Sequence, residues 1–307
     1  MPWYERFDTV AAQRFPGLRV LREEPMARHT TFRVGGPARR MAFPAAPEEL
    51  AALLALAAEE GWPWLAAGNG SNLLADDGGL DMLVIVTTAM DRLERTGERT
   101  LRAWAGVSLA RLAVFAMEQR LAGLAFAHGI PGSLGGAVFM NAGAYGGEMR
   151  QVVSSVTAWL PGRGVTELRG EELAFGYRRS CFGGNGGVVL WADLELNTGD
   201  SAAIRAEMEE LIRRRREKQP LEYPSAGSTF KRPEGHYAAA LIDQCGLRGT
   251  AVGGAMVSPK HAGFIVNTGG ATCADVLALM AQVRDTVCRE TGVTLEPEVR
   301  ILRRPEQ

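Results

Sequence analysis

The sequence predicts an α+β fold that is built from several small units. Helical and strand-like segments are mixed along the 307 residues, but they do not follow the regular βαβ alternation that a doubly wound parallel sheet requires. The chain is long enough for more than one domain. Its 37 glycines gather in loops between the elements, where the backbone can approach a ligand closely.

Four segments have the pattern of helices, because apolar residues recur three and four positions apart on one face. Pro47 marks a helix start and Ser108 a helix cap, while Thr272 and Asp275 form a pair typical of a capping box. The predicted helices span residues 47–60, 108–117, 201–218 and 272–291.

Four further segments are apolar or β-branched and are bounded by Gly, Pro and Asp, which is typical of strands. A domain boundary is expected at 198–201, after one strand and before a long charged helix. The predicted strands span residues 64–67, 82–88, 153–160 and 188–196.

Composition and charge exclude several classes of protein. The formal net charge is −1, so no overall field attracts nucleic acid or an anionic membrane, and neither is an expected partner. The first ten residues lack the apolar run of a signal peptide, and the apolar stretch 50–58 is far shorter than the ~20 residues of a membrane span. We therefore expect a cytoplasmic protein. The four cysteines and four histidines are scattered, so neither a metal site nor a disulfide framework is expected.

Two glycine loops are the strongest indication of a ligand. Glycines leave successive backbone N–H groups exposed, and such groups can hold a diphosphate. One loop alone would be explained as a tight turn, but two loops rich in Gly, Ser and Asn favour a binding site. The candidate binding residues are Gly68, Asn69, Gly70, Ser71, Asn72 and Leu73 in the first loop, and Gly129, Ile130, Pro131, Gly132, Ser133, Gly135, Gly136, Ala137 and Asn141 in and after the second.

The loops do not match the common nucleotide-binding motifs. The chain contains no Gly-Lys-Ser/Thr, which excludes a P-loop. The spacing of Gly129, Gly132 and Gly135 differs from G-x-G-x-x-G, and Gly68-x-Gly70 lacks the third glycine, so a Rossmann site is disfavoured.

Together with the segment 30–38 (Thr-Thr-Phe-Arg-Val-Gly-Gly-Pro-Ala), the two loops resemble the FAD-binding region of the UDP-N-acetylenolpyruvoylglucosamine reductase family. The resemblance covers about residues 30–300. It implies a two-subdomain FAD-binding fold of the PCMH or vanillyl-alcohol-oxidase-like type, followed by a C-terminal α+β substrate-binding domain. On this basis, residues 1–88 and 89–200 are expected to hold FAD, and residues 201–307 a UDP-sugar. The first loop lacks the His that carries covalent flavin in related oxidases, which implies non-covalent FAD.

Three further segments resemble catalytic segments of the family: 177–180, 225–231 and 296–300. The resemblance implies catalytic roles for Arg178, Ser228 and Glu298, with NADPH as the co-substrate. Arg178 is suited to bind the substrate carboxylate, and Ser228 to protonate the carbon next to it. Glu298 is suited either to hydrogen-bond the same group or to orient its neighbours.

Each of these residues also has a simpler explanation when it is taken singly. Arg178 beside Arg179 is typical of a solvated basic face, Ser228 after Gly227 of a turn, and Glu298 of an exposed strand end. Their joint occurrence within family-like segments favours catalysis. Tyr177, Lys218 and His261 are candidates for substrate binding, and Lys218 matches a family position that contacts the sugar-nucleotide diphosphate.

Two departures from the family pattern stand out. Arg232 occupies a position where many relatives have Asn, and only residues 181–187 separate the Tyr177 motif from the next strand, where some members insert a Tyr-bearing loop. The chain therefore resembles the shorter subtype of the family. Two alternatives stay open: another FAD oxidoreductase of the same fold that acts on a hydroxylated small molecule, and a non-catalytic nucleotide-binding protein.

Overall fold

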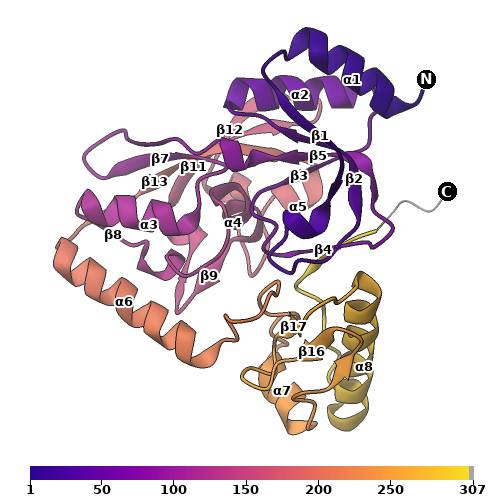
Figure 1. The fold of residues 1–307 in the computed structure, drawn as a ribbon. Coiled ribbons are helices and arrows are strands. Elements are labelled where there is room, and N and C mark those ends of the chain that lie inside the picture. The colour runs from indigo at the N-terminus through magenta and orange to yellow at the C-terminus, as the bar shows by residue number, and fades with distance from the viewer. Residues whose placement is uncertain (304–307) are drawn as a thin grey trace. The chain divides into compact units, whose positions relative to one another are not determined.

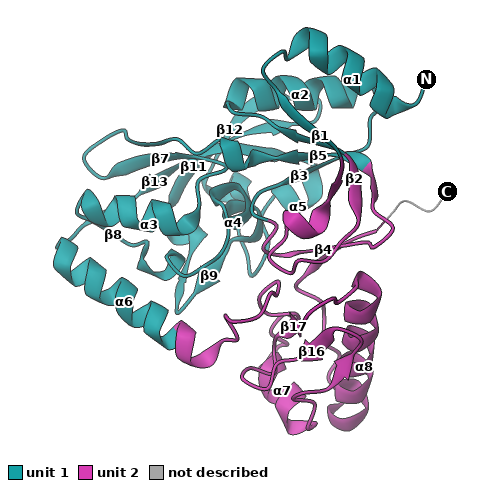
Figure 2. Ribbon diagram, viewed as in Figure 1, with its two compact units in different colours: residues 1–22, 40–69, 82–214 teal, residues 23–39, 70–81, 215–307 magenta. Residues whose placement is uncertain are grey.

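The computed structural model describes residues 1–303 and divides into two compact units with interleaved chain segments (Figures 1 and 2). Unit 1 contains residues 1–22, 40–69 and 82–214, and unit 2 contains residues 23–39, 70–81 and 215–307. Each unit has its own cluster of buried apolar side chains. Each unit therefore has its own core, to which segments distant in sequence contribute.

Unit 1 is built on a five-stranded antiparallel sheet of order β12-β11-β13-β7-β6. Helix α4 packs on β13 and β7, while α2 contacts β13 and β12. The helices are α1 (Trp3–Arg14), α2 (Pro47–Glu59), α3 (Leu109–Glu118), α4 (Leu134–Met140) and α5 (Phe182–Asn185), and the strands of this sheet are β6 (Leu93–Arg95), β7 (Thr100–Trp104), β11 (Val153–Leu160), β12 (Gly164–Arg169) and β13 (Val188–Glu195).

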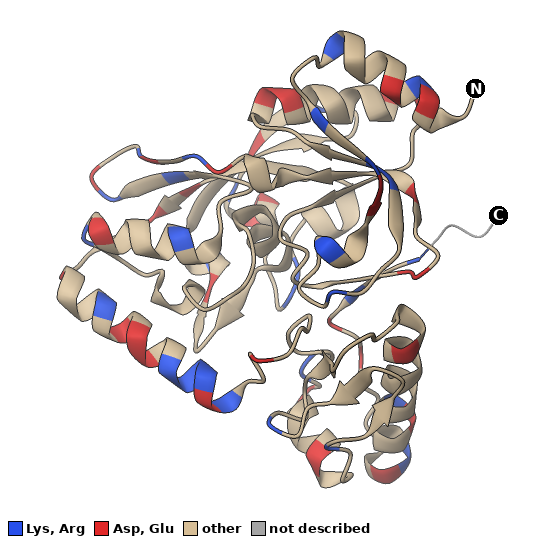
Figure 3. Ribbon diagram, in the orientation of Figure 1, with Lys and Arg blue, Asp and Glu red and all other residues tan. Residues whose placement is uncertain are grey.

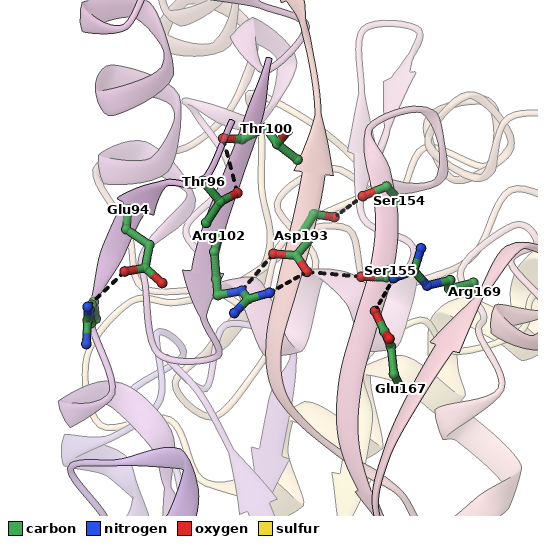
Figure 4. A network of polar contacts seen from close by, with 10 residues as sticks. Glu94, Thr96, Thr100, Arg102, Ser154, Ser155, Glu167, Arg169 and Asp193 are labelled. Carbon is green, nitrogen blue, oxygen red and sulfur yellow. Dashed lines mark hydrogen bonds and ion pairs between the residues drawn. The ribbon is translucent and has the colours of Figure 1, made fainter. Parts of the chain in front are cut away.

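One face of this sheet carries a polar network around Asp193 (Figure 4). Arg102 on β7 donates to both Asp193 carboxylate oxygens, at 2.8 and 2.9 Å, across a directly paired register. Ser155 on β11 donates to the same carboxylate at 3.1 Å, and Ser154 donates to the Asp193 backbone oxygen. The buried Ser155 hydroxyl therefore has its hydrogen-bond partner within the sheet.

Short elements complete unit 1, and four elements cross the division between the units. β8 (Leu121–Ala122) pairs with β14 (Asn197–Thr198), β9 (Gly143–Ala144) with β10 (Gly147–Glu148), and β3 (Trp64–Ala67) runs parallel to β5. The elements that carry residues of both units are β1 (Arg19–Pro25), β2 (Pro37–Phe43), β5 (Leu80–Val86) and α6 (Ser201–Lys218).

Unit 2 packs α7 (Ala238–Gln244) and α8 (Cys273–Thr291) with a three-stranded sheet of β15 (Ala251–Val252), β16 (Ala255–Val257) and β17 (Ile265–Asn267). The segment 70–81 belongs to this unit through two sets of contacts. β4 (Leu73–Ala75) pairs in parallel with β18 (Arg300–Leu302), and the Asp77 carboxylate accepts from the Cys273 and Ala274 N–H groups at the start of α8.

The predicted helices and strands are present, and α6 and β11 have the predicted bounds. The predicted strand 82–88 is wrong at its end, because β5 stops at Val86 and residues 87–89 form a 3₁₀ helix. Both predicted caps are present, because Ser108 accepts from the Arg111 N–H and Thr272 and Asp275 form the full capping box. Residues 134–137, which the sequence placed in the second glycine loop, form the first turn of α4. Two glycines disfavour a helix there, but a Cβ at Gly135 would lie 3.1 Å from the Ala105 Cβ, so close packing against Ala105 favours glycine.

The three-part division at residues 88 and 200 stays a prediction. Among residues 1–303, no helix is long and apolar enough to cross a membrane. Lys, Arg and Glu are mixed along α6 (Figure 3). Within this helix, the Glu210 carboxylate accepts hydrogen bonds from Arg213 and Arg214. These two arginines lower the pKa of Glu210 to about 2.

Candidate active site

The second glycine loop of unit 1 is held against the start of α3. The loop forms an isolated bridge in which Ser133 is paired with Ser108. The Leu109 N–H donates to the Gly132 oxygen at 3.0 Å, and the Leu134 N–H donates to the Val107 oxygen at 2.8 Å. The N-terminal cap of α3 therefore fixes the loop in a defined position.

The two predicted loops meet within unit 1 at Gly68 and Ser133. A Cβ at Gly68 would lie 1.9 Å from the Ser133 Oγ, so a side chain at position 68 would displace the Ser133 hydroxyl. The Ser133 side chain is 1% exposed, and its Oγ has no hydrogen-bond partner among residues 1–303. A buried hydroxyl without a partner costs free energy, and a bound polar group would satisfy it. This junction fits the phosphate-bearing part of a cofactor such as FAD.

His128 precedes the second loop and was missed by the sequence reasoning. Its Nδ1 is also buried without a partner in the described part of the chain, and burial lowers the pKa of the ring. The imidazole is therefore neutral at pH 7. The sequence could have indicated His128 as a candidate site residue, because it directly precedes Gly129 of the second glycine loop.

The first loop is divided between the units, with Gly68 and Asn69 in unit 1 and residues 70–73 in unit 2. Gly70 has a φ of +60°, and a Cβ there would lie 2.1 Å from the His29 oxygen. The Thr31 N–H donates to the Gly70 oxygen at 3.4 Å. The family-like segment 30–38 and this half of the loop are thus neighbours within unit 2.

Asn72 connects the first loop to the segment that carries Glu298, just before β18. The Asn72 Nδ2 donates to the Glu298 backbone oxygen at 3.0 Å, and the Arg300 N–H donates to the Asn72 oxygen at 2.9 Å. Leu73, which follows, is paired with Arg300 in the parallel ladder of β4 and β18. A predicted cofactor residue and a predicted catalytic residue therefore share one hydrogen-bonded segment of unit 2.

Ser228 and Glu298 lie on neighbouring backbone segments in unit 2. The Glu298 N–H donates to the Thr229 oxygen at 2.8 Å, and Phe230 forms a bridge with Pro297. The Ser228 side chain is exposed, as a group that must meet a substrate has to be. The structure therefore brings these two predicted catalytic residues together.

The Ser228 turn is fixed by its neighbours on both sides. The buried Thr229 donates its N–H to the Gly263 oxygen at 2.9 Å, and its hydroxyl accepts from the Ile265 N–H at 3.0 Å. The Thr31 hydroxyl donates to the Ser225 oxygen at 2.7 Å. The segment 30–38 thus also supports the turn that presents Ser228.

Arg178 lies in unit 1, in a tight turn at residues 176–179. Its φ is +54°, a left-handed conformation that residues other than glycine rarely adopt. Its Nη2 donates to the Gly143 oxygen at 3.3 Å, and its guanidinium lies 5.2 Å from the centre of the Tyr177 ring. Tyr177 is 53% exposed, so its ring is available to a ligand.

Lys218 and His261, the other two candidates for substrate binding, lie in unit 2. Lys218 is exposed at the end of α6. The His261 Nδ1 accepts from the Gly263 N–H at 3.1 Å, and burial lowers the pKa of the ring. The neutral imidazole therefore carries its proton on Nε2. Because Gly263 also accepts from Thr229, His261 is tied to the Ser228 turn.

The structure describes both positions at which the sequence departs from the family pattern, Arg232 and the connection 181–187. The guanidinium of Arg232 stacks 3.9 Å from the centre of the Tyr237 ring. The short connection at residues 181–187 contains α5.

No group of His, Cys, Asp and Glu in residues 1–303 could hold a metal ion. All four cysteines are free, and burial raises the pKa of the Cys273 thiol to about 12. That thiol is protonated at neutral pH and is a poor nucleophile.

The fold and the glycine-loop junction define an FAD-binding oxidoreductase. Residues 38–168 match the model of the FAD binding domain, and residues 219–302 match that of the UDP-N-acetylenolpyruvoylglucosamine reductase C-terminal domain. A UDP-N-acetylenolpyruvoylglucosamine reductase of Pediococcus pentosaceus is 46% identical over 96% of this chain and 98% of its own length. The chain belongs to the UDP-N-acetylenolpyruvoylglucosamine reductase family.

Solved structures agree with this assignment. The UDP-N-acetylenolpyruvylglucosamine reductase of Thermus caldophilus superposes with a TM-score of 0.79 at 36% identity, over 93% of this chain and 98% of that one. An alkyldihydroxyacetonephosphate synthase superposes with a TM-score of 0.50 at 14% identity, over 97% of this chain and 61% of that one. At that identity the likeness concerns the fold alone, and it agrees with the predicted flavin-oxidase type.

Proposed function

We propose that the protein reduces UDP-N-acetylenolpyruvoylglucosamine to UDP-N-acetylmuramate, with NADPH as the reductant and FAD as the bound carrier. The observation that carries this proposal is the 46% identity over nearly the whole of both chains to a reductase of that name. The Ser228 and Glu298 segments, held next to the first glycine loop in unit 2, support it independently.

The cofactor residues are proposed from the geometry of each loop. Ser133 and the backbone around Gly68 would hold the diphosphate of FAD, because the buried Ser133 hydroxyl has no partner among residues 1–303 and lies against the bare backbone of Gly68. When it is bound, FAD supplies the hydride for the enolpyruvyl group after accepting it from NADPH. No covalent attachment is expected, since the first loop contains no His or Cys.

The catalytic roles follow from the chemistry of the substrate. Addition of a hydride to the terminal carbon of the enolpyruvyl group places negative charge next to its carboxylate. Arg178 would bind that carboxylate through its fork of donors and stabilise the charge. Ser228 would then donate its proton to the carbon beside the carboxylate, which is basic enough to take a proton from a hydroxyl.

Glu298 and the substrate-binding residues complete the proposal. Glu298 is on the segment next to Ser228. As the protonated acid it would hydrogen-bond the same carboxylate; as the carboxylate it would orient its neighbours. Lys218 would contact the diphosphate of the sugar nucleotide, His261 its uridine end through Nε2–H, and Tyr177 the substrate or the nicotinamide. Binding of a UDP-sugar, without nucleic acid or membrane partners, is part of the same proposal.

The experiment is stopped-flow absorbance of the flavin in the purified holoprotein. We expect NADPH to bleach the yellow colour, and the enolpyruvyl sugar nucleotide to restore it with formation of UDP-N-acetylmuramate, identified by mass spectrometry. A yellow protein that the sugar nucleotide does not reoxidise would instead support a different FAD oxidoreductase. A colourless protein to which FAD does not bind would support a non-catalytic nucleotide-binding protein.

A further inference from the structure

The turn that presents Arg178 is short and needs support from outside. The Gly176 N–H donates to the Arg179 oxygen at 3.0 Å, and the Arg179 N–H donates to the Gly176 oxygen at 3.2 Å. Arg178 lies at the turn position with a φ of +54°. An arginine in this conformation is strained, and such strain persists only where the surrounding structure holds it.

Asn141, the residue that ends α4, holds this turn. Its side chain is fully buried, and its Nδ2 donates to the Gly176 oxygen at 3.0 Å, the same oxygen that accepts from the Arg179 N–H. Nδ2 also donates to the Glu148 Oε2 at 3.0 Å, and Oδ1 accepts from the Arg150 N–H at 2.9 Å. Both amide hydrogens and the amide oxygen therefore bind protein groups.

Few other residues can take the place of Asn141. Its φ is +42°, which Asn tolerates better than most residues other than glycine. Asp has no hydrogen to donate and would set a second carboxylate against that of Glu148. Gln is one methylene longer and would not fit a site with no exposed surface.

Two further contacts join the same stretch of chain to the turn. The Ser180 hydroxyl donates to the Phe139 oxygen at 2.7 Å, and the Arg178 guanidinium donates to the Gly143 oxygen at 3.3 Å. Residues 139–143 thus contact the turn on both sides of Arg179. Because α4 begins at the second glycine loop, one short helix links that loop to the arginine.

We infer that Asn141 is a positioning residue, which holds the Arg178 guanidinium where it binds the substrate carboxylate. The inference rests on the role proposed above for Arg178. The sequence placed Asn141 among the cofactor-binding residues, which stays a prediction. Its three protein contacts support the positioning role instead, because they leave its amide no hydrogen to donate to FAD.

The test is Asn141→Gly in the full-length holoprotein, because glycine keeps the left-handed backbone and removes all three side-chain contacts. We expect normal FAD content and normal reduction of the flavin by NADPH. Reoxidation by saturating enolpyruvyl sugar nucleotide should be slowed by up to about 100-fold, since misplacement of a catalytic group by ~1 Å has an effect of this size. Ser180→Ala should slow the same step by a smaller factor, and it keeps the test valid if Asn141→Gly fails to fold.

The double variant Asn141→Gly/Arg178→Ala separates positioning from general damage. If Asn141 acts through Arg178, the double variant reoxidises no more slowly than Arg178→Ala alone. The control is Ser155→Ala, which removes a buried hydrogen bond in the sheet of unit 1 and should leave both half-reactions unchanged.

Three results would overturn the inference: normal reoxidation in both Asn141→Gly and Ser180→Ala, full additivity in the double variant, or loss of FAD from Asn141→Gly. Failure of the proposed function gives a different result, because the sugar nucleotide would then not reoxidise the flavin of the wild-type protein. If only the role proposed for Arg178 is wrong, Arg178→Ala would reoxidise at the normal rate.

Discussion

At the scale of single residues, the proposal makes the exposed hydroxyl of Ser228 a proton donor. Only the reoxidation half-reaction needs that proton. Ser228→Ala should leave reduction of the flavin by NADPH unchanged and slow reoxidation by the sugar nucleotide by about 10²–10⁴-fold, the usual contribution of a positioned proton donor. Stopped-flow absorbance measures both steps. Thr268→Ala, an exposed hydroxyl elsewhere in unit 2, is the control. Equal slowing of both steps would contradict a role as proton donor.

The Ser133 hydroxyl, in contrast to that of Ser228, is buried, and it has no hydrogen-bond partner among residues 1–303. Ser133→Ala should therefore leave the melting temperature of the apoprotein unchanged or raise it, yet weaken FAD binding by about 2- to 13-fold, the equivalent of one hydrogen bond of about 0.5–1.5 kcal/mol. Thermal unfolding and fluorescence titration with FAD measure the two effects.

Ser155→Ala should behave in the reverse manner, because the Ser155 hydroxyl donates to Asp193. We expect a lower melting temperature and normal FAD affinity.

For Ser133→Ala, an unchanged affinity for FAD would contradict the proposed site and would place the diphosphate elsewhere.

At the scale of elements, the capping box of α8 supports the core of unit 2, because α8 supplies many of its buried side chains. The Thr272 Oγ1 accepts from the Asp275 N–H at 3.0 Å. Thr272→Ala should lower the free energy of unfolding by about 0.5–2 kcal/mol. Urea denaturation measures this, and Thr268→Ala, outside the helix, should have a smaller effect.

The other half of the capping box depends on pH. Hydrogen bonds from Thr272 lower the pKa of Asp275 below its ordinary value of 3.8. A lowered pKa in the folded state stabilises the protein above the ordinary value, and this contribution is lost as the pH falls through the folded pKa. The stability difference between wild type and Asp275→Asn should therefore be largest near neutral pH and should shrink below pH 3.8. A difference that is constant with pH would contradict this assignment.

Some elements could be predicted from the sequence, and others could not. Long amphipathic helices with caps, such as α6 and α8, follow from residues three and four positions apart, which is local information. Helix α4 was read as loop because Gly135 and Gly136 disfavour helix, and only its packing on β7 and β13 explains it. Strand β4 is three residues long and exists because β18, some 230 residues later, pairs with it.

At the scale of the whole molecule, a ligand that binds only the folded state should stabilise the protein. With free FAD at 100 times its dissociation constant, the free energy of unfolding should rise by about 2.7 kcal/mol, so the melting temperature should increase with FAD concentration. Differential scanning fluorimetry measures this shift. AMP, which lacks the diphosphate and the isoalloxazine, is the control ligand, and an equal shift with AMP would contradict a site built for FAD.

The sequence by itself determined the family, the main helices and strands, and the segments that carry the candidate catalytic residues. These properties depend on local periodicity and on motifs of adjacent residues, such as 129–137 and 225–231. The tertiary structure alone decided which motifs are neighbours. It placed residues 30–39 and 70–81 in one unit with the C-terminal segment. It also formed the hydrogen bonds from Asn72 to the Glu298 backbone oxygen and from Asn141 to the Gly176 oxygen in the Arg178 turn. Contacts between residues so far apart in sequence arise only when apolar surfaces are buried together, and no local pattern encodes them.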